Sequence, residues 1–147
     1  MINSIKKIRE QTGLSVADIK NALAEAGGNE KKALEILSSR GHEIAEKKSF
    51  RRAAEGAVES YIHANRKVGA SLVLNCETDF VAKSPDFLEL AHDLAMQIAS
   101  MDPKDAEELL SQPFIKDQNL TVKDLINRSV AKLGENIKVG DFKRYEV

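Results

Sequence analysis

The amino-acid sequence predicts an α+β fold, in which a small bundle of three helices precedes an antiparallel sheet covered by helices. Up to about residue 40, apolar residues recur at helical spacing in three short segments separated by glycine-containing turns. From about residue 55 the apolar period changes to two and later returns to helical spacing, as expected for strands and helices in separate runs. With 42% hydrophobic and 31% charged residues over 147 positions, the chain has an ordinary globular composition.

Residues 1–41 are predicted to form a three-helix module. The expected N-caps are Asn3 or Ser4, Ser15 with Asp18 three residues on, and Asn29; the expected ends are Thr12-Gly13, Gly27-Gly28 and Arg40-Gly41. Three helices in so few residues give only a marginal core. We therefore expect this module to recognise a partner while tethered to a larger domain.

Residues 42–54 are highly charged and are predicted to be a connector. Its basic cluster consists of Lys47, Lys48, Arg51 and Arg52. The cluster is either a solvated surface or a contact for a partner protein or RNA. The formal net charge of −1 gives no electrostatic reason to expect tight, sequence-independent binding of nucleic acid.

Residues 55–147 are predicted to form the core domain. Alternation over residues 58–63 and 72–76, joined by a turn at residues 65–69, indicates a β-hairpin. Ser84 and Pro85 are typical of a helix start, and Thr121 with Asp124 predicts another capped helix, which ends at Gly134. A short helix near residues 104–110 and a final strand over residues 137–147 complete the core.

Enzyme motifs are missing from the sequence. Gly27-Gly28 lacks the Lys and Ser/Thr of a phosphate-binding loop, and His42, His63 and His92 are scattered, so we expect no catalytic residue, metal site or cofactor. The single cysteine, Cys76, lies in register with inward-facing residues, which favours a buried structural thiol over a nucleophile paired with His63. One cysteine, no signal peptide and no membrane-spanning run predict a cytoplasmic protein.

The segment from Asn75 to Ser84 breaks the surrounding pattern, because it places Phe80 and Val81 in a connector between a strand and a helix. Phe80 either folds back over the sheet edge to close the core or projects as an anchor into the pocket of a partner. In the second case the carboxylate of Asp79 would act at the same place, by repelling phosphate oxygens or by competing for a metal ion.

Thr78-Asp79-Phe80-Val81, preceded by Asn75-Cys76-Glu77, resembles the signature of the EF-Ts family of bacterial translation elongation factors. Further segments that resemble the family, in the right order, are Thr12-Gly13, Lys32-Ala33-Leu34, residues 52–56 with Tyr61-Ile62-His63, Gln112-Pro113-Phe114-Ile115, residues 121–126 and residues 132–137. The resemblance implies a ubiquitin-associated-like module joined to a single core subdomain, as in the short form of the family. Short forms can dimerise to complete the exchange surface, so a homodimer is also implied.

The function that this resemblance implies is nucleotide exchange on the translational GTPase EF-Tu, without covalent chemistry. The partner would be EF-Tu in its GDP-bound or nucleotide-free state, with no direct nucleic acid and no membrane. Thr78, Asp79, Phe80 and Val81 match the loop that disturbs the magnesium and phosphate site, and Thr12, Gly13, Val16 and Ala17 match the docking contact of the module. Two segments depart from the family's pattern: Leu14-Ser15-Val16-Ala17 and Lys138-Val139-Gly140-Asp141.

Three other functions compete with this one. A generic adaptor would use an apolar patch of the module and give no role to Asp79 or Phe80. An RNA-binding translation factor would use the basic cluster and bind with a steep salt dependence. A thiol enzyme would need an exposed Cys76 of low pKa.

Overall fold

The N-terminal part of the chain is a bundle of three helices, α1 (Ile2–Thr12), α2 (Val16–Glu25) and α3 (Glu30–Lys48). The computed structural model describes residues 1–147. Ser15 and Asn29 accept the predicted cap hydrogen bonds of α2 and α3, and Gly13 closes α1 with a left-handed φ of 66°. The bundle has a small core of its own, which consists of Ile8, Ile19, Ala22, Leu23, Ala33 and Leu37.

The predicted cap of α1 is wrong. The helix already begins at Ile2, and neither Asn3 nor Ser4 caps it with a side chain. The Ser4 hydroxyl instead donates to Glu30 Oε1 at 2.9 Å, because it faces the start of α3. Ser4 therefore joins two helices of the bundle.

The predicted end of the third helix at Arg40-Gly41 is also wrong, since α3 continues to Lys48. Gly41 is buried where α3 crosses α7 (Val122–Leu133); a Cβ added to it would lie 3.8 Å from the Asn127 carbonyl oxygen and 3.9 Å from the Ala131 Cβ. The glycine thus lies at a close approach of two helices. The end of α3 packs on the core, and only residues 49–54 of the predicted connector form a loop.

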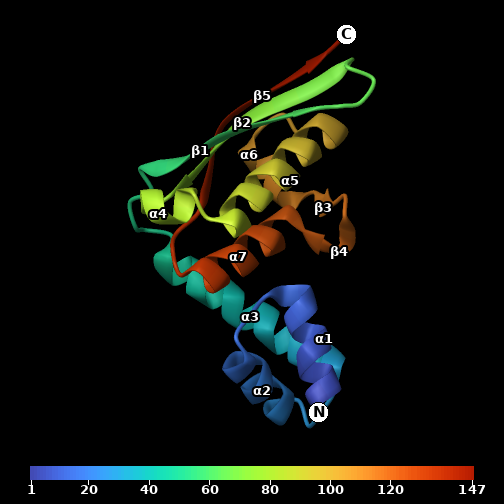
Figure 1. Cartoon of the computed structure of the whole chain (residues 1–147), viewed down its shortest axis with the longest axis vertical. Helices are drawn as coiled ribbons and strands as arrows, with labels where there is room; N and C mark the ends of the chain where they lie inside the picture. Colours follow the sequence, from blue (N-terminus) through green and yellow to red (C-terminus); the bar gives the residue numbers. More distant parts are fainter.

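A three-stranded antiparallel sheet, as predicted, lies in the core domain. Its strands are β1 (Glu55–Ile62), β2 (Val68–Cys76) and β5 (Lys138–Glu146), in the order β1-β2-β5. One face of the sheet is covered by α5 (Pro85–Met101), and α7 lies beyond α5 (Figure 1). The short helix α6 (Ala106–Ser111) contacts α7. The inward residues of β2 and the buried face of α5 form the main core, which includes Leu72, Leu74, Cys76, Phe87, Leu94 and Ile98.

A small hairpin of β3 (Pro113–Phe114) and β4 (Asp117–Thr121) was not predicted. Gln97, which is fully buried, fastens it to α5: its Nε2 donates to the Pro113 carbonyl at 3.0 Å, and its Oε1 accepts from the Ile115 N–H at 2.9 Å. The hairpin leads directly into α7, which begins with the predicted capping box of Thr121 and Asp124.

None of the helices is both long enough and apolar enough to span a membrane.

Candidate functional site

The loop singled out in the sequence forms a single helical turn, α4 (Asp79–Ala82), at the edge of the sheet. Thr78 is its N-cap, and the hydroxyl oxygen accepts from the Val81 N–H at 3.2 Å. Val81 and Ala82 are buried in the core, whereas Phe80 is 89% exposed. The turn therefore points Phe80 away from the protein, and the alternative in which Phe80 closes the core is wrong.

Glu135, which lies in the segment between α7 and β5, holds this loop in place with hydrogen bonds. Its Oε1 accepts from the backbone N–H groups of Glu77 at 3.1 Å and Thr78 at 3.0 Å, and its Oε2 accepts from the Thr78 hydroxyl at 2.7 Å. The backbone N–H of Asn136 in turn donates to Glu77 Oε2 at 3.1 Å. One carboxylate thus satisfies three donors just before Phe80, and charge-assisted bonds of this kind are among the stronger ones in proteins.

Sequence reasoning did not identify Glu135 as a functional residue. The segment containing it was noted only as part of the family resemblance. Glu135 lies 57 positions after Thr78, so no local sequence pattern indicated that the two residues are in contact.

Asp79 is paired within the loop. Its carboxylate lies 2.7 Å from Lys83 Nζ, one helical turn further on, and both side chains are largely exposed. The hydrogen bond and the charge of Asp79 raise the pKa of Lys83 above its usual value. Because an exposed pair is readily broken by water and salt, the Asp79 carboxylate can exchange Lys83 for another cation.

The four predicted contact residues of the N-terminal module divide into two pairs. Thr12 is buried; its hydroxyl donates to the Ile8 carbonyl at 2.8 Å and accepts from the Leu14 N–H at 3.3 Å. Gly13 supplies the left-handed residue of the same turn. Val16 and Ala17, at the start of α2, are exposed. The first pair shapes the turn, and the second pair presents side chains that a partner can touch.

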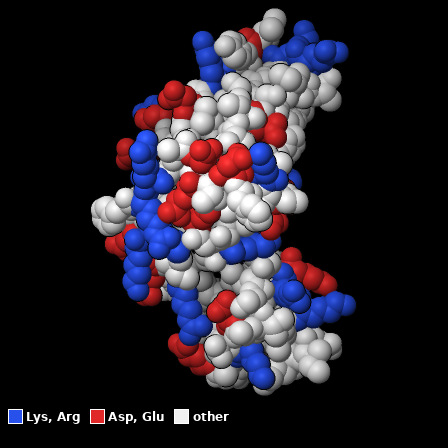
Figure 2. Space-filling view, turned by 60° about the vertical axis from the view of Figure 1, so that its left-hand side comes forward, with Lys and Arg blue, Asp and Glu red and all other residues white.

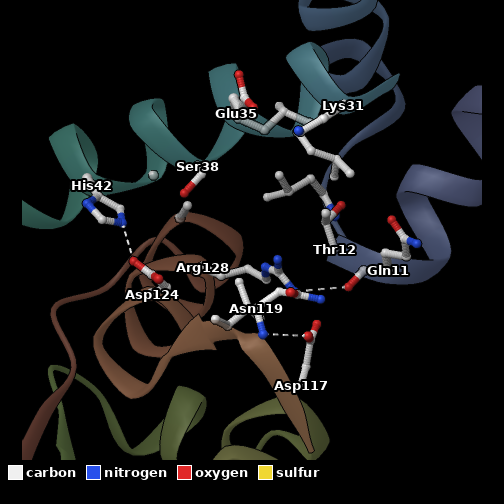
Figure 3. A pocket seen from close by; sticks show the side chains of 16 residues that line it. Gln11, Thr12, Lys31, Glu35, Ser38, His42, Asp117, Asn119, Asp124 and Arg128 are labelled. Atoms are coloured by element: carbon white, nitrogen blue, oxygen red, sulfur yellow. Dashed lines mark hydrogen bonds and ion pairs between the residues drawn. The ribbon is translucent and has the colours of Figure 1, made fainter. Parts of the chain in front are cut away.

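A cleft of about 670 Å³ separates the helical bundle from the core (Figure 3). Two contacts span it: His42 Nε2 lies 2.8 Å from Asp124 Oδ1, and Arg128 Nη1 donates to the Gln11 carbonyl at 3.2 Å. Side chains of both signs line the cleft, among them Lys31, Glu35, Asp117, Asp124 and Arg128. The long helix α3 and these contacts set the orientation of the bundle on the core.

Cys76 is not part of a reactive pair. It is fully buried, its thiol donates to the Thr78 carbonyl at 3.2 Å, and burial raises its pKa. In the hairpin Cys76 pairs with Glu55, whereas His63 follows Ile62 at the opposite end of β1. Since each strand residue advances roughly 3.3 Å and eight positions separate Glu55 from His63, the thiol and the imidazole lie about 25 Å apart. The geometry excludes a Cys76–His63 nucleophile.

Known proteins resemble the chain along nearly all of its length. A model of the family described as "Elongation factor TS" matches residues 77–147, which include α4 and Glu135. The chain is 39% identical to elongation factor Ts of Fervidobacterium nodosum over 97% of its own length and 95% of that protein. For the corresponding proteins of Thermotoga petrophila and Moorella thermoacetica, the identities are 40% and 39%, over 94% and 93% of each relative.

The alignment with the Fervidobacterium protein spans 188 positions, although the chain has only 147 residues. These relatives therefore contain internal segments that the chain lacks. The family resemblance first suggested by the segment from Asn75 to Val81 is thus confirmed over the aligned length. The chain belongs to the elongation factor Ts family of translation elongation factors.

Proposed function

We propose that this protein is a guanine-nucleotide exchange factor for the GTPase EF-Tu, which it converts from the GDP-bound state through a nucleotide-free complex. The observation that carries the proposal is the exposed Phe80 on a turn whose preceding residues are clamped by Glu135. An aromatic side chain on a preorganised loop is a common form of interface hot spot. It suits a protein that acts by pushing into a partner rather than by covalent chemistry.

In this mechanism residues 1–41 dock on the nucleotide-binding domain of EF-Tu, and the core in residues 55–147 holds the partner. Residues 42–54, which are the end of α3 and the loop after it, connect the two. The exposed Val16 and Ala17 supply the docking contact of the module, over the turn shaped by Thr12 and Gly13. Phe80 then wedges into the nucleotide domain near its magnesium site, with Thr78 and Val81 holding the wedge in place.

Asp79 contributes at the same place once its ion pair with Lys83 opens. Its carboxylate then repels phosphate oxygens or competes for the magnesium ion. Because the pair is already formed in the free protein, we assign Phe80 the larger share of the effect.

Thermodynamic linkage fixes the rest of the cycle. If the protein weakens GDP binding to EF-Tu by some factor, GDP must weaken the binding of the protein by the same factor. The exchange factor therefore accelerates both release and rebinding, and the nucleotide concentrations determine which nucleotide is bound at the end. Each ~1.4 kcal/mol removed from the release barrier gives about a tenfold faster rate.

We further propose a homodimer that forms through the outer face of the sheet. That face lies opposite α5 and carries three exposed side chains, Val58 at 77%, Ile62 at 63% and Tyr145 at 60%. Ile62 and Tyr145 align across the sheet, since both pair with Gly69. Sedimentation equilibrium tests this: a dimer that becomes a monomer in Ile62→Lys supports it, and a monomeric wild-type protein contradicts it.

The experiment for the exchange function is stopped-flow release of a fluorescent GDP analogue from EF-Tu, at increasing concentrations of this protein. The proposal predicts a release rate that rises with concentration and then saturates. It also predicts that added GDP weakens the binding of the protein to EF-Tu. Spontaneous release that stays unchanged in the presence of the folded protein would overturn the proposal.

A further inference from the structure

Two of the five phenylalanines project into solvent, although the other three pack inside. Phe87 and Phe114 are 0% and 5% exposed, and Phe142 packs against the core. Phe50 is 93% exposed and Phe80 is 89% exposed. Single exposed apolar residues are common on protein surfaces. The position of Phe50 relative to Phe80 is what distinguishes this pair.

The loops that carry the two aromatic side chains are fastened to each other. Arg51, next to Phe50, has its Nη1 3.7 Å from Oε2 of Glu77, three residues before Phe80. Asn136 binds both loops: its Nδ2 donates to the Arg51 carbonyl at 2.7 Å, and its backbone N–H donates to Glu77 Oε2 at 3.1 Å. Asn136 is 4% exposed, so this junction is shielded from water. The two loops therefore lie on the same side of the core, beside α4 (Figure 1).

The loop of residues 49–54 is held in one conformation near Phe50. The Ser49 hydroxyl donates to the Glu46 carbonyl at 2.6 Å, and the Arg51 N–H donates to the Lys48 carbonyl at 3.0 Å. Lys48 Nζ also donates to the Gly134 carbonyl at 2.9 Å. A loop that is already ordered loses little conformational entropy when its exposed side chain binds a partner.

The charges around Phe50 favour a protein partner over RNA. Of the basic cluster, Lys48 and Arg51 are used in contacts within the protein, and only Lys47 and Arg52 are exposed without an ion pair. In Figure 2, which brings this side of the molecule forward, a column of basic side chains runs down the left edge, and acidic side chains lie directly beside it. Only Arg51 of the cluster has an ion pair, with Glu77, and the three cations that remain release few counterions compared with the roughly 6–10 phosphate contacts typical of tight, sequence-independent binding.

We propose that Phe50 is a second aromatic contact for the GTPase that Phe80 engages, with Lys47 and Arg52 facing acidic residues at the rim of its pocket. This inference rests on the proposed exchange function and extends the partner surface of the same site. Phe80 and Phe50 have different roles in this complex. Phe80 disturbs the nucleotide site, and Phe50 adds affinity at the neighbouring position without entering that site.

The test compares wild type with Phe50→Ala and Phe50→Leu in the full chain. GDP release from EF-Tu is titrated by stopped flow, and binding to nucleotide-free EF-Tu is measured by calorimetry. Met101→Ala is the matched control, because Met101 is an exposed apolar residue at the other end of α5. We expect Phe50→Ala to raise the half-saturating concentration and the dissociation constant about tenfold. The maximal release rate should stay within about twofold, with Phe50→Leu intermediate.

Equal titrations for wild type and Phe50→Ala would overturn this inference while leaving the exchange function intact. A loss of maximal rate at unchanged affinity would also overturn it, because Phe50 would then act at the nucleotide site. A wild-type protein that neither binds EF-Tu nor speeds release removes both proposals. RNA binding is measured by fluorescence anisotropy with a labelled single-stranded RNA. Salt-sensitive binding that Phe50→Ala abolishes would assign the surface around Phe50 to RNA instead of the GTPase.

Discussion

The Thr78 hydroxyl makes two hydrogen bonds at once. It donates to the Glu135 carboxylate at 2.7 Å and accepts from the Val81 N–H at 3.2 Å. Thr78 is therefore both the cap of α4 and the point at which that turn is tied to the segment before β5. The loop that carries Phe80 is therefore held by a residue that is distant in sequence.

Glu135→Gln is expected to slow maximal GDP release by about tenfold, since hydrogen bonds to a charged group contribute about 1.5–3 kcal/mol. The glutamine keeps one acceptor for the backbone donors but offers an amide, which cannot accept, to the Thr78 hydroxyl. Stopped-flow release measures the effect, and the exposed Glu107→Gln is the matched control. If Glu135 acts through the Phe80 loop, the same change in a Phe80→Ala background should cost little more. Additive losses would show that Glu135 has another role.

Gly41→Ala is expected to stabilise the protein by about 0.5–1 kcal/mol, because alanine is the better helix former and the added Cβ meets only ordinary contacts at 3.8–3.9 Å. Gly41→Leu should instead destabilise it by about 1–3 kcal/mol, since a larger side chain would separate α3 from α7. Urea unfolding of the three proteins measures both effects. A destabilised alanine variant would mean that the helices approach more closely than described.

The stability supplied by Asp124 should depend on pH. Burial raises its pKa, but hydrogen bonds from Thr121 and the contact with His42 outweigh it, so the folded-state pKa lies below the ordinary value. A lowered pKa contributes stability above the unfolded value of about 3.9, and the contribution is lost as pH falls through the folded-state pKa. We therefore expect Asp124→Asn to be less stable by about 1 kcal/mol at pH 7. The difference should shrink below pH ~4 in unfolding experiments; a constant difference would contradict this cause.

Cys76 should react slowly with iodoacetamide at pH 8 in the native protein and rapidly in urea. Burial shields the thiol and raises its pKa, which lowers the fraction of thiolate. Mass spectrometry of timed samples measures the modified fraction. Rapid alkylation of the folded protein would contradict this prediction and support the alternative in which Cys76 is a reactive thiol.

Local signals in the sequence predicted the elements that begin with their own caps. Ser84-Pro85 and Thr121 with Asp124 lie next to the helices they start, and both predictions are confirmed. The extent of α3 was mispredicted because Gly41 resembles a helix breaker until α7 is packed against it. The hairpin of β3 and β4 left no alternating pattern, since β3 has only two residues.

The sequence predicted the location of the candidate site but not its geometry. The segment Thr78–Val81 stood out from its neighbours, but the sequence left the direction of Phe80 open. That direction depends on which side of α4 packs into the core, where Val81 and Ala82 are buried. The role of Glu135 depends on the chain returning to the sheet before β5, which only the fold determines.

The most direct test of the central claim is the maximal rate of GDP release from EF-Tu with Phe80→Ala, measured beside wild type at saturating protein. A buried aromatic anchor contributes about 2–4 kcal/mol, so the account predicts a loss of on the order of a hundredfold. Because Phe80 is 89% exposed, its removal should leave the unfolding midpoint unchanged. A folded Phe80→Ala protein that releases GDP at the wild-type rate would contradict the account, as would a variant that loses activity only because it unfolds.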